Sequence, residues 1–242
     1  MKLVIGTANF GTPYGISNSL KKISVREVRK ILKFAKKNNI SLLDTATNYK
    51  DSEKIIGQLN ESKNFNIITK LPKIGRNIHL IHKFINSSLI KLKKKKLDGV
   101  LIHALSDLNS KNLNRLIVEL KKLKKKGIIK KFGVSVYSKK NLEEIINNNK
   151  IDIVQFPLSI FDLRFLDNKL IQKLKRRKIK IYVRSVFLQG IIFLDSNKLK
   201  KKFKYHSKQI ISFKKNFDNN YEKMINYNLG FIKNFKYIDG II

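Results

Sequence analysis

Short apolar runs alternate with longer amphipathic stretches along the whole chain. Eight of the short runs are rich in Ile, Val and Leu and read as strands. The stretches between them carry apolar residues at three- and four-residue spacing, the period of a helix with one buried face. The predicted strands are Leu3–Gly6, Leu42–Asp44, Asn66–Lys70, Gly99–His103, Ile129–Ser135, Ile153–Phe156, Ile181–Ser185 and Ile238–Ile242. The predicted helices between them are Val25–Asn38, Ser52–Leu59, Leu80–Leu92, Leu113–Lys125, Leu142–Asn148 and Leu166–Arg177.

The repeated order of strand and helix predicts βαβ units around a parallel sheet, and so many repeats favour a closed TIM-type (β/α)8 barrel. An open doubly wound sheet is the alternative. The glycine-rich turn that follows the first strand of such a sheet is absent, because Gly6, Gly11 and Gly15 have the wrong spacing. Since single barrels run to about 250 residues, we expect residues 1–242 to form one α/β barrel domain.

The last part of the chain differs from the rest. Residues 191–236 show no strand pattern and predict two helices, Tyr205–Asn216 and Asn219–Asn234. The eighth strand then reaches the last residue, so we expect a barrel whose final βα unit is truncated. An exposed apolar edge invites pairing with another chain, and we therefore expect marginal stability or aggregation.

The chain is strongly basic, with 53 Lys and Arg against 17 Asp and Glu and a formal charge of +36. The abundance of Lys, Ile and Asn and the scarcity of Ala indicate a general bias towards A- and T-rich codons. The main Lys clusters, at 93–96, 121–126 and 173–180, fall near the ends of predicted helices, where cations oppose the negative end of the helix dipole. A surface for nucleic acid is disfavoured, because aromatic residues do not interleave with these clusters.

Two further features narrow the class of protein. The chain has no Cys, which excludes disulfides, a Cys-based zinc site and a thiol nucleophile. It begins with only three apolar residues before Gly6, too few for a secretory signal, and its longest uncharged stretch is broken by Gly and Pro. We expect a cytoplasmic protein that does not enter membranes.

A polar residue stands at or near the carboxyl end of each predicted strand from the second to the seventh. In a barrel of this class the active site lies at that end of the strands. These residues are Asp44, Lys70, His103, Ser135, Gln155, Arg184 and Ser185. Each one alone has an ordinary structural explanation, such as a turn for Asp44 or the core for His103. Because all of them fall at one end of the sheet, the sequence predicts a single polar pocket.

The segments around these polar residues resemble the aldo-keto reductase family, and the resemblance covers essentially the whole chain. The opening segment Gly6–Gly11 and the segment Val183–Gly190 are most similar to a bacterial subgroup associated with surface-sugar biosynthesis. The stretch from Asp44 to Tyr49 resembles the family's D-T-A-x-x-Y signature. The other matching segments are Ser52-Glu53, Ile67–Lys70, Leu101–His103, Phe132–Ser135, Val154-Gln155 and Arg184–Gly190.

The resemblance implies reduction of an aldehyde or ketone with hydride from NADPH, or alternatively NADH. It implies four catalytic residues, Asp44, Tyr49, Lys70 and His103. Tyr49 is expected to donate the proton, with its pKa lowered by Lys70, while Asp44 pairs with Lys70 and His103 orients the carbonyl. The expected cofactor-binding residues are Gly6, Thr7, Asp44, Ser135, Gln155, Arg184, Ser185 and Gly190.

Two positions depart from the family pattern. Val136 stands where the family commonly has an Asn for the nicotinamide carboxamide, and the motif for the 2′-phosphate of NADPH would lie beyond Ile242. We therefore expect poor discrimination between NADPH and NADH. No metal is expected, because the four His residues are scattered.

Short βα loops suggest a small polar carbonyl substrate, of a kind that includes sugar derivatives. An alternative from a different class is a non-enzymatic nicotinamide-binding module that senses redox state or regulates a partner. The same four residues are compatible with that alternative. A third alternative is a basic nucleic-acid-binding protein, disfavoured because the charge is spread over many helix ends.

Overall fold

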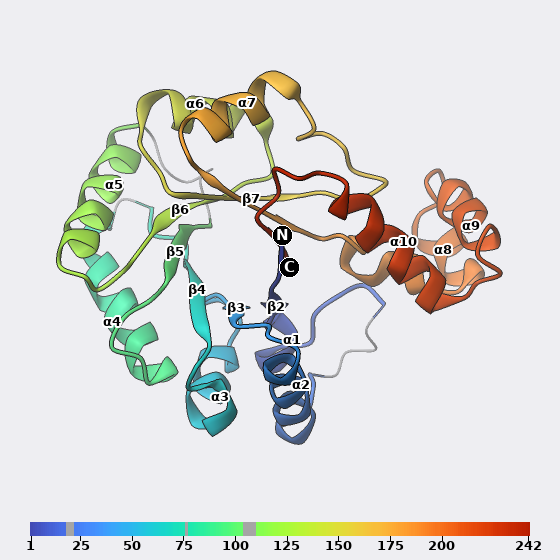
Figure 1. Ribbon diagram of the computed structural model, residues 1–242, viewed down its shortest axis with the longest axis horizontal. Helices are drawn as coiled ribbons and strands as arrows, with labels where there is room; N and C mark the ends of the chain where they lie inside the picture. The colour runs from blue at the N-terminus through green and yellow to red at the C-terminus, as the bar shows by residue number, and fades with distance from the viewer. Residues whose placement is uncertain (18–21, 76, 104–109) are drawn as a thin grey trace.

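The computed structural model describes residues 1–17, 22–75, 77–103 and 110–242, and parallel strands surrounded by helices form its centre (Figure 1). The first strand is split at Val4, so that β1 pairs with β9 and β2 pairs with β3. The other strands pair in chain order, which brings the two ends of the chain together. The strands are β1 (Lys2–Leu3), β2 (Ile5–Gly6), β3 (Leu42–Asp44), β4 (Asn66–Leu71), β5 (Gly99–Ile102), β6 (Phe132–Ser135), β7 (Ile153–Pro157), β8 (Lys180–Arg184) and β9 (Gly240–Ile241). The predicted α/β barrel is therefore confirmed.

The helices lie outside the strands, as the amphipathic pattern predicts (Figure 1). Those of the barrel are α1 (Ala8–Gly11), α2 (Val25–Lys37), α3 (Ser52–Gln58), α4 (Ile81–Leu92), α5 (Ser110–Lys125), α6 (Lys139–Asn148) and α7 (Asn168–Arg176). After β8 come α8 (Ser196–Lys202), α9 (Ser207–Lys215) and α10 (Tyr221–Lys233). Short 3-10 turns are η1 (Asn60–Ser62), η2 (Ile78–Leu80) and η3 (Leu188–Phe193).

Two short helices were not expected from the sequence. Helix α8 has Leu199 as its one buried residue, so its sequence shows no apolar stripe. The side chain of Asp195 nevertheless caps it by accepting a hydrogen bond from the amide of Lys198 at 2.8 Å. Helix α1 is a four-residue turn that ends at Gly11. The two helices predicted in residues 191–236 are present as α9 and α10, and α8 precedes them as a third helix that the pattern did not indicate.

Alternate residues of the strands face opposite sides of the sheet. Leu42, Ile68, Leu101 and Ile153 pack together with Val4 in one compact cluster. Their neighbours in the sequence, such as Leu43 and Ile67, belong instead to the large core that includes the buried faces of the helices. The first cluster therefore fills the barrel interior, and the second fills the layer between the strands and the helices.

Two of the predicted Lys clusters lie in the last turns of helices. The last turn of α5 carries Lys122, Lys124 and Lys125, and that of α7 carries Lys173, Lys175 and Arg176. These positions agree with the expectation from the sequence. Among the described residues, no helix is long and apolar enough to cross a membrane.

Candidate active site

The site follows from the two-residue period of the strands. The interior apolar residues Leu42, Ile68 and Ile153 are each followed, two positions later, by a polar residue. These polar residues are Asp44, Lys70 and Gln155, and all three are buried. Ser135 is the register partner of Gln155 across the β6–β7 pair. One polar layer therefore lies directly above the apolar layer, at the carboxyl ends of the strands.

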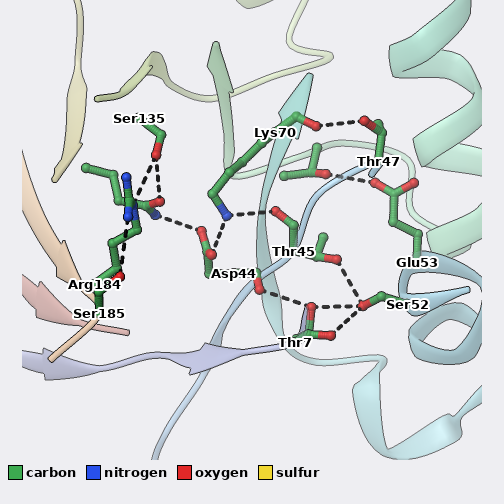
Figure 2. Close-up of polar contacts among 12 residues, drawn as sticks. Thr7, Asp44, Thr45, Thr47, Ser52, Glu53, Lys70, Ser135, Arg184 and Ser185 are labelled. Carbon is green, nitrogen blue, oxygen red and sulfur yellow. Dashed lines mark hydrogen bonds and ion pairs between the residues drawn. The ribbon is translucent and has the colours of Figure 1, made fainter. Parts of the chain in front are cut away.

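A buried ion pair occupies this layer. The ammonium of Lys70 bonds a carboxylate oxygen of Asp44 and donates to the main-chain oxygen of Thr45 at 3.0 Å (Figure 2). Burial lowers the pKa of Lys70, and the Asp44 carboxylate opposes that shift. Because both side chains are almost fully buried, each depends on the other for compensation of its charge.

A chain of hydrogen bonds continues from the second oxygen of Asp44. Gln155 donates its Nε2 to Asp44 Oδ1 at 2.9 Å and accepts a bond from Ser135 Oγ at 3.1 Å. Arg184 Nε donates to Ser135 Oγ at 3.4 Å, and its guanidinium lies 3.9 Å from the centre of the Tyr137 ring. Figure 2 shows this chain running from Arg184 towards Lys70. The arrangement fixes the orientation of the Gln155 amide and of the Asp44 carboxylate.

Tyr49 lies in the loop between β3 and α3, above the ion pair. Its ring centre is 5.3 Å from the Lys70 ammonium nitrogen and 6.4 Å from the ring centre of Tyr14. The main chain of this loop packs tightly, because a side chain on Gly11 would come within 2.0 Å of the Tyr49 carbonyl oxygen. The phenol is thus held next to a cation by the backbone on either side of it.

The pKa of Tyr49 is raised well above its ordinary value, first by burial and then by the Asp44 carboxylate. The expected lowering of this pKa was therefore wrong. The physical reason is that the loss of solvent around the phenol and the negative charge of Asp44 together outweigh the nearby Lys70 cation while the phenol is protonated. Tyr49 consequently keeps its proton at neutral and moderately alkaline pH.

A cavity of about 390 Å³ opens beside Tyr49. Several of the predicted residues border it, namely Gly6, Thr7, Asp44, Tyr49, Arg184, Ser185 and Gly190. Aromatic side chains that sequence reasoning did not single out form other walls, namely Tyr14, Phe187 and Phe193. Four predicted residues of the described chain do not border the cavity, namely Lys70, His103, Ser135 and Gln155.

The segment after β8 has an unusual backbone where it borders this cavity. Ser185, Leu188, Gln189 and Gly190 all have positive φ angles. At Gly190, with φ of 86°, a side chain would also approach Ser17 Oγ to 2.0 Å. The amide of Ile16 donates to the oxygen of Gln189 at 2.8 Å, which ties this segment to the loop after the first strand. Small residues and main chain therefore face the cavity next to the Arg184 cation.

The role of Thr7 in cofactor binding stays a prediction. Its side chain is fully buried, and its hydroxyl donates to the main-chain oxygen of Asp44 at 3.0 Å. The hydroxyl therefore has a structural partner, although Thr7 borders the cavity. The roles of Ser135 and Gln155 towards a carboxamide stay predictions, since these two side chains hydrogen-bond to each other here.

His103 follows β5 directly and is partly buried. Burial, with the cations of Lys70 and Arg184, lowers its pKa from 6.5 to about 4. We expect the imidazole to be neutral at pH 7. Because the unfolded chain protonates this residue first, its contribution should reduce stability as the pH falls from 6.5 towards 4 and should be absent above 6.5.

This prediction is checked by following the His ring protons of the folded protein in an NMR titration. A His103→Gln variant identifies the signal, and the exposed His206 serves as the comparison within the same protein. A His103 midpoint at or above that of His206 would contradict the expected neutral imidazole. His103→Gln should also lose part of the acid-dependent fall in stability.

Among the described residues, no group of three or more His, Asp and Glu residues is placed to hold a metal ion. The candidate roles of the site therefore rest on its proton donors, its cations and its main chain.

Comparisons with known proteins agree with this geometry. The family model described as "Aldo/keto reductase family" matches residues 2–229. The fold is similar to that of a glycerol dehydrogenase from Gluconobacter oxydans, with a TM-score of 0.74, 20% identity and coverage of 99% of this chain and 81% of that one. It is also similar to a putative aldo-keto reductase from Pseudomonas aeruginosa, with a TM-score of 0.64, 19% identity and coverage of 85% and 80%. At these identities the structures support the fold alone. No curated protein matches the chain in sequence.

Proposed function

Because this chain belongs to the aldo/keto reductase family, we propose that it reduces a small polar aldehyde or ketone with Tyr49 as the proton donor. Family membership implies an oxidoreductase that acts on carbonyl groups with a nicotinamide cofactor. The observation that supports Tyr49 most strongly is its position, with the phenol beside the cavity and 5.3 Å from the buried Lys70 ammonium.

The cavity fits the nicotinamide and pyrophosphate part of such a cofactor. Gly6 and Gly190 border the cavity, and Arg184 supplies positive charge for phosphate or for contact with an aromatic ring. When bound, the cofactor supplies the hydride that no side chain can provide. We propose NADPH as the cofactor, with NADH as the alternative, because the family typically uses NADPH.

Residues of the chain supply the proton that the reduced carbonyl oxygen requires. Tyr49 holds its proton firmly at rest, because burial and Asp44 raise its pKa. As the phenol gives up this proton to an alkoxide, negative charge develops close to the Lys70 ammonium, which stabilises it. Asp44 keeps that ammonium in place and compensates its burial. His103, neutral at pH 7, is assigned by the sequence to orient the carbonyl oxygen with a hydrogen bond, and this role stays a prediction because His103 does not border the described cavity.

The proposed substrate is a small polar carbonyl compound derived from a sugar. The mixture of Tyr14 and Phe193 with Asp44 and Tyr49 on the cavity walls suits a molecule with both polar and apolar faces. The similarity of Gly6–Gly11 and Val183–Gly190 to the surface-sugar subgroup favours the same class.

The experiment is a comparison of NADPH oxidation by the purified chain with short aldoses and with apolar aldehydes of similar size. We expect measurable turnover with both and a higher kcat/KM for the aldoses. The reverse order would contradict the substrate class. Binding of NADPH without turnover of either the aldoses or the apolar aldehydes would contradict the proposed enzymatic activity and favour the redox-sensing module.

A further inference from the structure

Three buried hydroxyl groups lie beside the loop that carries Tyr49. They belong to Thr7, Thr45 and Ser52, and all three side chains are fully buried. Ser52 is the central member, because its Oγ lies 2.9 Å from Thr7 Oγ1 and 3.2 Å from Thr45 Oγ1 (Figure 2). Together they connect the end of the first strand, the end of β3 and the first turn of α3.

The available protons fix the direction of this chain. A main-chain oxygen only accepts, so Thr7 Oγ1 gives its one proton to the carbonyl oxygen of Asp44 at 3.0 Å. Ser52 must then donate towards Thr7, whose hydroxyl and main-chain oxygens lie 2.9 and 3.0 Å away. Thr45 is left to donate to Ser52. The chain therefore runs in one direction from the side chain of Thr45 to the carbonyl of Asp44, and each hydroxyl uses its only proton.

Both ends of the chain lie on the peptide that holds Lys70. The Asp44 side chain pairs with the Lys70 ammonium, and the Thr45 carbonyl accepts from the same ammonium at 3.0 Å. The amide of Ser52 also donates to the carbonyl of Tyr49 at 2.9 Å. Displacement of Ser52 would therefore shift both the Lys70 ammonium and the Tyr49 phenol.

We infer that Ser52 is a positioning residue, which sets the Asp44–Thr45 peptide and thereby the placement of Lys70 beneath Tyr49. Ser52 itself is buried and makes its bonds to Thr7, Thr45 and Tyr49, so it acts through them. The predicted effect of Ser52 on kcat rests on the proposed function, because it requires that the protein reduces carbonyl compounds. The one-way hydrogen-bond chain, in contrast, has a consequence for folding stability that needs no catalysis.

The kinetic test compares Ser52→Ala with Ser62→Ala. Ser62 is a matched control, since it is also buried and its hydroxyl donates to main-chain oxygens, including that of Leu59 at 2.7 Å, at the other end of α3. We expect Ser52→Ala to lower kcat about tenfold or more, with the KM of the carbonyl and the Kd of NADPH within about twofold. Ser62→Ala should lose stability and keep its kcat. Equal kcat values in the two variants would overturn the positioning role.

The stability test is a double-mutant cycle of Thr45→Val and Ser52→Ala, measured by urea unfolding. Thr45→Val should destabilise the parent. It should not destabilise Ser52→Ala, because there the Thr45 hydroxyl has already lost its acceptor and is a buried donor without a bond. We expect the unfolding equilibrium constant of the double variant to be about tenfold lower than additivity predicts. Additive effects would overturn the one-way chain.

The two tests separate the inference from the proposed function. A parent chain without carbonyl reduction would contradict the proposed function, and the cycle would then decide alone whether the hydroxyl chain exists. An active parent with an additive cycle would overturn the chain and leave the proposed function intact.

Discussion

Replacement of Tyr49 by Phe is expected to lower carbonyl reduction by roughly 100- to 10,000-fold, the range for loss of a general acid. The ring beside the cavity is kept, and only the hydroxyl with its proton is removed. The affinity for NADPH should therefore change little. The measurement is steady-state turnover together with cofactor binding, followed by quenching or transfer of fluorescence.

Tyr205→Phe is the control, since Tyr205 is 91% exposed and lies between α8 and α9, away from the cavity. It should turn over at the parent rate. Turnover of Tyr49→Phe within tenfold of the parent would contradict the role of Tyr49 as proton donor. Because the Tyr49 pKa is raised, loss of its proton should not lower the parent rate between about pH 6 and 9.

Lys70→Met is expected to reduce turnover to a similar extent and to destabilise the fold as well. The phenolate that forms during proton donation would lose the ammonium near its ring. Asp44 would remain buried without its cationic partner, which costs about 3–5 kcal/mol for an ion pair broken on one side. The measurements are kcat and the free energy of unfolding in urea.

A second variant separates the two effects of Lys70. In Asp44→Asn with Lys70→Met, both charges are removed, so much of the lost stability should return. Catalysis should not return, because the cation is still absent. If the double variant regained the parent kcat together with its stability, Lys70 would be a structural residue and the electrostatic role would be wrong.

Much of the site was predictable because the strand period is simple. Asp44, Lys70 and Gln155 each stand two residues after an interior apolar residue, a spacing visible in the sequence. Once the strands are placed, this spacing alone directs their side chains into the barrel. The barrel itself was predictable for the same reason, since eight apolar runs separated by amphipathic stretches leave few other arrangements.

Other features depended on packing that no local pattern shows. The raised pKa of Tyr49 results from burial and from the nearby Asp44 carboxylate, and the burial depends on contacts between segments far apart in the sequence. Ser52 and Glu53 matched the family pattern, but their burial did not follow from that match. They are two polar residues on the buried side of a short helix, next to Ile55 and Ile56. Buried polar side chains need hydrogen-bond partners, as Glu53 has in Thr69.

The buried Asp44–Lys70 pair and Tyr49 are proposed to serve carbonyl reduction with a nicotinamide. The most direct measurement is the transfer of deuterium from NADPH labelled at the reactive ring carbon to the product alcohol, detected by mass spectrometry. We expect the product of the parent chain to carry the label from only one of the two labelled epimers, because the cofactor is held in one orientation. Turnover should fall sharply in Tyr49→Phe. An alcohol product without label from either epimer, or bound cofactor with no product at all, would contradict the claim.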